Sequence, residues 1–185
     1  MRIIIARHTQ TGMNMEKCYS GQIDVPLNHE GVLQAQALAH LLSDIPIGYA
    51  YSSDLVRAKQ TLRILVGNRE AEVASSHLLR ELDVGIAAGL SREEALARFR
   101  NEQVDTRHKN PDFTSIGGEN KLHVLGRYHQ IFTRIHEKHR EGGKVGLVVC
   151  HGTALRYYLT SNPNLAGLRY PEQGEYLEVD LDTFF

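Results

Sequence analysis

Apolar residues along the chain follow two spacings, and the two spacings alternate through the sequence. Short apolar runs, several of them rich in β-branched residues, predict strands. The expected strands lie at 1–6, 49–52, 72–78 and 144–150, and a last one alternates at Leu177, Val179 and Leu181. Apolar residues three and four apart predict amphipathic helices between them. Strands that alternate with helices predict an α/β protein with helices on both faces of its sheet.

Capping residues and apolar stripes predict where the helices begin and which faces they bury. We expect Asn28 to cap a helix that runs to about Leu42, Asp54 to cap the next, and Ser91 with Glu94 to form a capping box for a third. A long helix is expected over 121–140 and a last one from Ala154. The predicted buried faces are Leu33, Ala37, Leu38 and Leu41, then Leu55, Ala58, Leu62 and Leu65, then Leu125, Tyr128, Phe132 and Ile135.

Two polar segments interrupt the alternation. Residues 11–25 predict a long loop, and 102–118 predict a second one because they contain Asn110-Pro111 and Gly117-Gly118. We expect a single domain over 1–185, with 91–119 as a lid or insertion over the functional site.

The composition disfavours several classes of partner. The chain has 185 residues, 42% of them hydrophobic, and a net charge of −1 with interspersed acids and bases, which argues against nucleic-acid and membrane-surface binding. No run suits a signal peptide or a transmembrane helix. Cys18 and Cys150 form no disulfide or metal pattern, so we expect a cytoplasmic protein with reduced thiols.

Two predicted strands end in histidine. Arg7-His8 follows the 1–6 strand and His151-Gly152 follows the 144–150 strand. Ligands of α/β sheets bind at the carboxyl ends of the strands, so the two histidines are expected to converge there. Arginine binds phosphate with two bonds, neutral imidazole can attack phosphorus, and Gly152 lets backbone approach a ligand closely. The alternative is two incidental histidines at strand ends.

Two further segments bring charges to the same edge. Arg57 lies in the first turn of its helix, where the helix dipole disfavours a cation. Binding an oxyanion would explain this position, and a solvent-facing arginine is the alternative. Glu81 and Asp83 follow the 72–78 strand, and either carboxyl could donate a proton to a leaving oxygen.

In their order, these residues resemble the histidine phosphatase superfamily, also called phosphoglycerate-mutase-like. The family's opening motif Arg-His-Gly-x-Thr-x-x-Asn is matched by Arg7, His8, Gln10, Thr11 and Asn14. Further family blocks are matched in order at 20–35, 53–61, 79–90, 117–119 and 148–156, and 18–27 is similar to α-ribazole phosphatases. The resemblance covers nearly the whole chain. It implies a three-layer α/β/α sandwich with a mostly parallel central sheet.

The resemblance implies a role for each matched residue. His8 would be the nucleophile that forms a phosphohistidine, and Glu81 the general acid that later activates water. Residues implied to hold the phosphoryl group or its ester are Arg7, Arg57, His151, Gly152, Asn14 and Gln22. No metal or other cofactor is expected, because Arg and His neutralise the phosphate charge. His129, His136 and His139 lie at mixed spacing without a carboxylate that completes a metal-ligand set.

The chain also departs from the family pattern. Thr9 stands where the family usually has Gly, Asn120 stands where it has Ser, and 86–88 lacks an aromatic and an acid that are often found there. These changes affect the expected substrate contacts more than the phosphate pocket. A basic stretch is interpreted as a solvated lid or as a contact for a second anionic group; its residues are Arg98, Arg100, Arg107, His108 and Lys109.

We therefore expect a phosphomonoester hydrolase that acts on a small phosphorylated metabolite. The short 91–119 segment leaves the pocket open, so water can take the phosphoryl group. One alternative is a phosphoglycerate mutase or another phosphotransferase. A second is an inactive member that only binds a phospho-ligand. The sequence leaves the substrate and the oligomeric state open.

Overall fold

Five strands of the described residues form one central sheet. They are β1 (Arg2–Arg7), β2 (Ile47–Ser53), β3 (Glu72–Ser76), β4 (Val145–Cys150) and β5 (Tyr176–Asp180). Their order is β3-β2-β4-β1-β5; β5 is antiparallel to β1 and the other pairs are parallel. The structure is a computed structural model, and it describes residues 1–99, 111–165 and 167–185.

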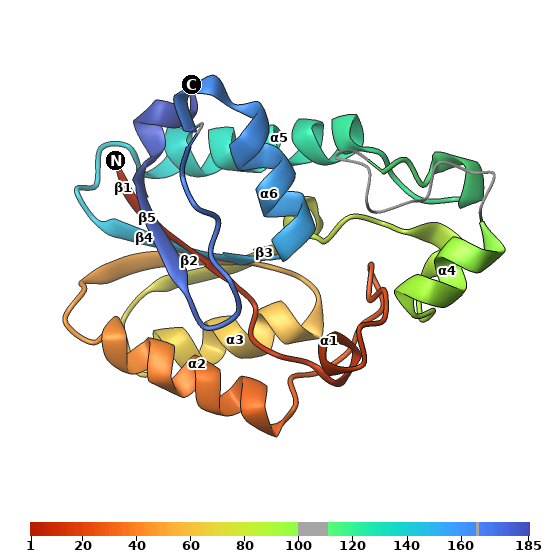
Figure 1. Cartoon of the computed structure of the whole chain (residues 1–185). Coiled ribbons are helices and arrows are strands. Elements are labelled where there is room, and N and C mark those ends of the chain that lie inside the picture. Colours follow the sequence, from red (N-terminus) through yellow and green to blue (C-terminus); the bar gives the residue numbers. More distant parts are fainter. Residues whose placement is uncertain (100–110, 166) are drawn as a thin grey trace.

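Helices cover both faces of this sheet. They are α1 (Gly12–Met15), α2 (His29–Leu41), α3 (Val56–Val66), α4 (Arg92–Arg98), α5 (Lys121–His139) and α6 (Gly152–Ser161). α2 and α3 lie on one face and α5 and α6 on the other, whereas α1 and α4 lie beyond the end of the sheet (Figure 1). The predicted three-layer α/β/α sandwich with a mostly parallel sheet is therefore confirmed.

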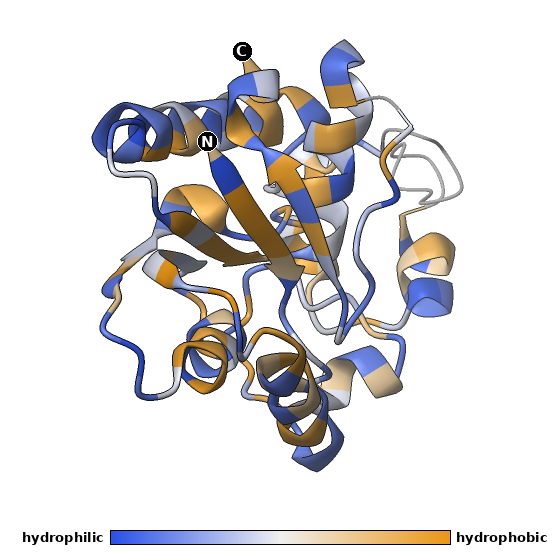
Figure 2. Ribbon diagram, turned by 90° about the vertical axis from the view of Figure 1, so that its left-hand side faces the viewer, coloured by the Kyte–Doolittle hydropathy of each residue, from blue (hydrophilic) through white to orange (hydrophobic). Residues whose placement is uncertain are grey.

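The alternation of side chains along β1 divides the core in two. Ile3 and Ile5 belong to the buried cluster beneath α5 and α6, whereas Ile4 and Ala6 belong to the cluster beneath α2 and α3. All four are fully buried. β1, in the interior of the sheet, is mainly hydrophobic, and the helices carry hydrophilic residues on their outer sides (Figure 2). A strand buried on both faces has its register firmly fixed, and this fixes the position of the residues directly after it.

The buried face of α2 differs from the prediction. Gly31, Ala35 and Leu38 are buried, whereas Leu33, Ala37 and Leu41 are exposed. A Cβ at Gly31 would lie 2.0 Å from the carbonyl oxygen of Gln10. This close approach of the Gln10 backbone turns the glycine side of α2 inward, and the larger side chains at 33 and 41 are turned toward solvent.

The predicted cap of α3 is also wrong. α3 begins at Val56, and Leu55 occupies the N-cap position without a side chain that can cap the helix. The first N–H of the helix, that of Val56, donates instead to Oδ1 of Asp24. Asp54 instead accepts two hydrogen bonds from Arg80, at 2.8 and 2.7 Å. A bidentate ion pair therefore competes successfully for this carboxylate. The predicted stripe of α3 is buried as expected; it consists of Leu55, Ala58, Leu62 and Leu65.

Several element ends are shifted from their predicted places. The predicted loop 11–25 contains α1, which Thr11 caps. β3 ends at Ser76, whose side chain caps a short 3-10 turn that takes in Leu78. β5 ends at Asp180, and Leu181 begins another such turn. The single domain and the 91–119 lid stay predictions; of that lid, 100–110 lies outside the described residues, as do Arg100, Arg107, His108 and Lys109 of the basic stretch.

Candidate active site

His8 and His151 lie side by side at the carboxyl ends of β1 and β4. Arg7 pairs with Cys150 in the parallel ladder, and the His8 N–H donates to the Cys150 carbonyl at 2.9 Å. His8 and His151, the residues that directly follow these two strands, are therefore neighbours, and their imidazole centroids are 5.0 Å apart. The predicted convergence of the two histidines is confirmed.

The ring of His8 is held in one tautomer. Its Nδ1 lies 2.8 Å from the carbonyl oxygen of Thr9, which can only accept a hydrogen bond. Nδ1 therefore carries the proton in the neutral ring, and Nε2 keeps its lone pair. Burial, followed by the positive charge of Arg57, lowers the pKa of His8 well below its usual range. A neutral imidazole with a free Nε2 is the form that can act as a nucleophile.

Arg57 is a buried cation beside these rings. Its guanidinium donates to the carbonyl oxygens of Ile23 and Gly21, at 2.7 and 2.8 Å. Its Nε has no hydrogen-bond partner among the described residues. The loop after α1 thus fixes the orientation of the side chain, and the Nε–H is among the donors that stay available to a ligand.

Arg7 lies across the first residue of α6. A Cβ at Gly152 would be 2.9 Å from Nε of Arg7 and 3.0 Å from its Cζ. The guanidinium also forms an ion pair with Glu172 at 2.9 Å. Gly152 was expected to admit a ligand; in the structure, its missing side chain leaves the room that Arg7 occupies.

His151 adds two more unpaired nitrogens. The ring is fully buried, and neither ring nitrogen has a hydrogen-bond partner within the described part of the chain. Burial, then Arg57 and His8, lowers the pKa of His151 well below its usual range. Buried polar atoms are nearly always satisfied, so the unpaired nitrogens of His151, Arg7 and Arg57 indicate a binding site for a polar group that carries negative charge.

Glu81 provides the carboxylate of the site. It accepts from the backbone N–H groups of Thr153 and Ala154 in the first turn of α6, at 3.1 and 2.8 Å, and from that of Leu82 at 2.8 Å. Asp83 instead accepts from the N–H of Gly85 and does not line the pocket. Of the two carboxyls left open by the residue pattern, the structure brings Glu81 to the histidines' pocket.

Asn14 and Gln22 occupy different positions. Asn14 lines the pocket and is oriented by Thr11 and Gln173. The Gln22 amide donates to the Glu81 carbonyl and accepts from Arg80, both at 3.2 Å, and it does not line the pocket. Gln22 therefore supports the Glu81 loop, and a contact with phosphate stays a prediction.

Arg127 is a residue that supports the site and that the sequence analysis missed. It extends from α5 to the carbonyl oxygens of Leu78, Arg80 and Glu81, and it forms a two-bond ion pair with Glu119. It therefore fixes the backbone that carries Glu81. One signal was available: Arg127 immediately precedes Tyr128 on the buried face of the helix, where a charged residue needs a partner.

One pocket of about 210 Å³ is lined by Arg7, His8, Asn14, Arg57 and Glu81 among others, and His151 lies beside it against the His8 ring. The complete lining consists of Arg7, His8, Asn14, Cys18, Tyr19, Ser20, Gly21, Arg57, Glu81, Leu82, Val84, Arg92, Pro111, Phe113, Thr153 and Arg156. A larger hollow of about 400 Å³ lies over α3, β2 and β3, but it contains none of the histidines or carboxylates described above. We therefore place the candidate active site in the smaller pocket.

Other reactive residues have structural surroundings. Burial raises the pKa of the Cys150 thiol to about 12, so this thiol stays protonated in the core. His136 contacts Asp182, and His139 stacks on Tyr49 with centroids 3.8 Å apart. Within the described ranges, no three His, Cys, Asp or Glu side chains cluster as metal ligands. No helix there has the length and apolar character needed to cross a membrane.

A buried imidazole pair with two arginines and one carboxylate, at the carboxyl edge of a parallel sheet, defines an anion site suited to a phosphoryl group. The chain belongs to the histidine phosphatase superfamily (branch 1), whose family model matches residues 3–171.

Individual relatives carry different activities in their names. The chain is 29% identical over 181 residues to 2,3-bisphosphoglycerate-dependent phosphoglycerate mutase 2 of Gloeobacter violaceus, covering 96% of this chain and 81% of the relative. The α-ribazole phosphatase of Shigella flexneri superposes with a TM-score of 0.81 at 25% identity, covering 97% and 90% of the two chains. A mycobacterial glucosyl-3-phosphoglycerate phosphatase in complex with VO3 gives the same four values.

Proposed function

We propose that this protein hydrolyses small phosphomonoesters through a phosphohistidine on His8. The observation that carries the proposal is the hydrogen bond from His8 Nδ1 to the Thr9 carbonyl, which leaves Nε2 free. This nitrogen lies in a pocket with Arg7, Arg57 and Glu81, beside His151. The phosphatases among the structural neighbours support the same reaction.

The first step transfers the phosphoryl group to the protein. His8 Nε2 attacks phosphorus, a P–N bond forms, and the P–O bond to the ester carbon chain breaks. The bonding pair goes to the leaving oxygen, which takes a proton from Glu81. Arg7, Arg57 and His151 bind the phosphoryl oxygens as charge redistributes over them.

The second step returns the protein to its starting state. Glu81 takes a proton from water, the water oxygen attacks phosphorus, and the P–N bond breaks with its pair returning to Nε2. Inorganic phosphate leaves, and the carboxyl group is again protonated for the next turnover.

Replacing His8 with Ala tests the proposal. Hydrolysis of an aryl phosphate is expected to fall at least about 1,000-fold, because the covalent step is lost. His40→Ala, an exposed histidine of α2, is the matched control and should keep full activity. Undiminished hydrolysis by the His8→Ala protein would exclude His8 as the nucleophile.

A mutase is the second candidate, because the matched sequence relatives are named phosphoglycerate mutases. It would pass the phosphoryl group from His8 to another hydroxyl instead of to water. With 3-phosphoglycerate, a phosphatase releases free phosphate, whereas a mutase forms the isomer without it. An inactive binder would do neither, and it would not acquire acid-labile, base-stable phosphate from a phosphorylated substrate.

A further inference from the structure

The loop that carries Glu81 is held along its backbone by α5. Four consecutive carbonyl groups of this loop, those of residues 78–81, accept hydrogen bonds from two adjacent residues of the helix. Arg127 donates to three of these carbonyls, at 2.5 to 3.0 Å, and the Tyr128 hydroxyl donates to that of Leu79 at 3.2 Å. The backbone that leads into Glu81 therefore has its position set by α5.

A largely buried ion pair fixes the guanidinium itself. Arg127 donates two hydrogen bonds to the carboxylate of Glu119, both at 3.0 Å, and only 11% of the arginine side chain is exposed. The same carboxylate accepts from the N–H of Asp83 at 3.0 Å, and the Glu119 N–H donates to the Asp83 carbonyl at 2.8 Å. A two-bond pair of this kind is strong and directional. Arg127 thus holds the loop before Glu81, and its partner Glu119 holds the loop after it.

The residues that bind phosphate in the proposed reaction are positioned by other elements. The ladder between β1 and β4 fixes His8, and two carbonyls of the loop after α1 fix Arg57. Within the described part of the chain, Glu81 is the one residue assigned to the reaction that Arg127 reaches with a hydrogen bond. The charge of Arg127 acts further away, because it lowers the pKa of His151, after burial, Arg57 and His8.

The position of Glu81 matters more for some esters than for others. In the first step, the leaving oxygen takes a proton from this carboxyl group. An alkoxide is strongly basic and needs that proton as the P–O bond breaks, whereas 4-nitrophenolate is weakly basic and leaves without it. The value of kcat/KM reports this first step. The value of kcat also includes the attack of water, which Glu81 assists in the same way for every ester.

We propose that Arg127 is a positioning residue for the proton transfers of Glu81, and that its contribution to the first step grows with the basicity of the leaving group. This inference rests on the proposed phosphatase function. It adds to the reaction a residue that touches neither the substrate nor the reacting atoms. A reacting group displaced by about 1 Å can cost roughly 100-fold in rate, so a loop that has lost its hydrogen-bond donor has a measurable effect.

The Arg127→Ala protein, assayed on glycerol 3-phosphate and on 4-nitrophenyl phosphate, tests the proposal. We expect kcat/KM to fall about 100-fold for the alkyl ester and by no more than a few-fold for the nitrophenyl ester. The value of kcat should fall for both, because water attack also needs Glu81. Loss of the positive charge near His151 acts on the phosphoryl group of both esters alike, so it leaves their ratio unchanged.

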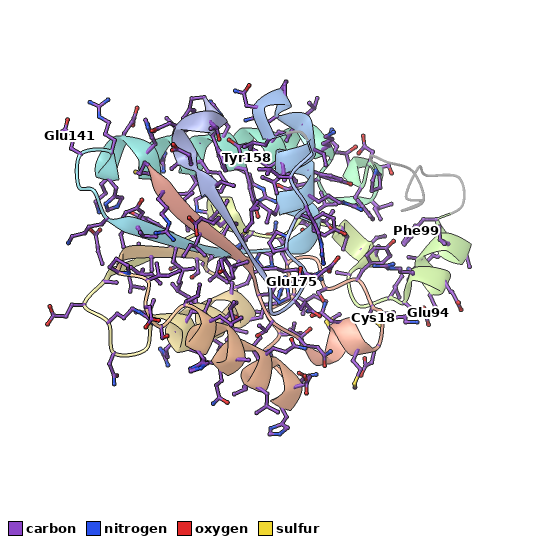
Figure 3. All side chains as sticks on the ribbon, turned by 60° about the vertical axis from the view of Figure 1, so that its left-hand side comes forward. Cys18, Glu94, Phe99, Glu141, Tyr158 and Glu175 are labelled. Carbon is purple, nitrogen blue, oxygen red and sulfur yellow. The ribbon has the colours of Figure 1, made fainter. Side chains whose placement is uncertain are left out.

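Arg134→Ala is the matched control in the same helix. Arg134 is exposed and lies about two turns further along α5 than Arg127. The helix runs away from the pocket in this direction: Glu141, just beyond its carboxyl end, lies at the opposite side of the molecule from Cys18 of the pocket wall (Figure 3). This control should keep kcat and kcat/KM for both esters.

A double-variant comparison shows whether Arg127 acts through Glu81. Glu81→Gln alone should lower kcat/KM selectively for glycerol 3-phosphate. Adding Arg127→Ala to it should then lower this value little further, because residues that act as one unit are not additive. Guanidinium ion, at concentrations that leave the protein folded, should restore part of the activity of the Arg127→Ala protein on glycerol 3-phosphate and none in the double variant.

The outcomes separate this inference from the proposed function. Equal losses of kcat/KM for the two esters, or additive losses in the double variant, would overturn the inference and leave the hydrolysis intact. If circular dichroism shows that the Arg127→Ala protein is unfolded, Glu119→Gln replaces it; this change removes the charge that orients the guanidinium, and it should give the same selectivity with a smaller loss. A wild-type protein that hydrolyses neither ester would overturn the proposed function and this inference with it.

Discussion

The inner end of the pocket and its outer wall are built in different ways. His8 and His151 are 3% and 0% exposed, and they follow adjacent strands whose ladder fixes their separation. Arg92 and Arg156, which line the outer wall, are exposed and come from two helices, of which α4 lies beyond the end of the sheet. Buried ladders give fixed distances for chemistry, whereas peripheral segments can change without disturbing them.

The largest expected effect of burying the two histidines is on the free energy of unfolding at low pH. The folded chain keeps His8 and His151 neutral because burial lowers both pKa values, whereas the unfolded chain takes up protons near the ordinary value of 6.5. The unfolded state therefore binds more protons than the folded state below pH 6.5. Each histidine then lowers the free energy of unfolding by about 1.4 kcal/mol for every unit by which the pH decreases. For the pair, the loss between pH 7 and pH 5 amounts to up to about 4 kcal/mol.

Urea unfolding at pH 7, 6 and 5 measures this loss. His8→Gln and His151→Gln should each remove about half of the slope that the pair contributes, since each leaves one titrating ring. His40→Gln, at an exposed position, should leave the slope unchanged. Equal slopes in all four proteins would show that the buried rings do not resist protonation.

A smaller effect is expected from a single methyl group at the inner end. Gly152→Ala places a Cβ 2.9 Å from Arg7 Nε, so the guanidinium has to move. A misplaced phosphate ligand costs roughly 100-fold in kcat/KM. Gly126→Ala is the matched control in α5, where nothing lies within 4 Å of the new Cβ; it should preserve activity and stabilise the protein by about 0.5–1 kcal/mol. Full activity of the Gly152→Ala protein would mean that Arg7 does not bind the phosphoryl group from this position.

The inner end was also the part that the sequence predicted best. The apolar runs before Arg7-His8 and His151-Gly152 identify buried parallel strands, and a parallel sheet brings their carboxyl ends to one edge. Arg57 was also predictable, because it lies in the first turn of the helix that follows β2 and therefore near the same edge of the sheet. Local pattern suffices there because each strand fixes the position of the residues at its carboxyl end.

Contacts between loops were not predictable in this way. The partner of Asp54 is Arg80, and Gly31 of α2 meets the backbone of Gln10; both depend on loop paths that no periodicity encodes. The same holds for Arg127, whose three carbonyl acceptors lie more than forty residues earlier in the chain. These contacts form only when distant segments are already in place, so local propensity carries no information about them.

The smallest expected effect concerns Thr9, where the chain departs from its family directly after His8. Thr9 is fully buried, and its N–H and hydroxyl both contact the hydroxyl oxygen of Thr61, at 3.2 and 3.3 Å. Thr61 uses its own hydroxyl proton on the carbonyl of Arg57, at 2.8 Å, so Thr9 has to be the donor to Thr61. The side chain thus connects the turn that carries His8 to the helix that carries Arg57, and it does not line the pocket.

Thr9→Val keeps the shape of the side chain and removes this one donor. It should lower the free energy of unfolding by about 1 kcal/mol and change kcat/KM by only a few-fold, because the carbonyl that orients His8 Nδ1 remains. Thr9→Gly also empties a buried volume and frees the backbone, so its loss should be larger by about 0.5–1 kcal/mol or more. Substrate preference should be unchanged in both variants. A shift in the ratio of activities on two alkyl phosphates that differ in their leaving group would instead mean that Thr9 acts on the outer wall, and the separation of the two regions would then be wrong.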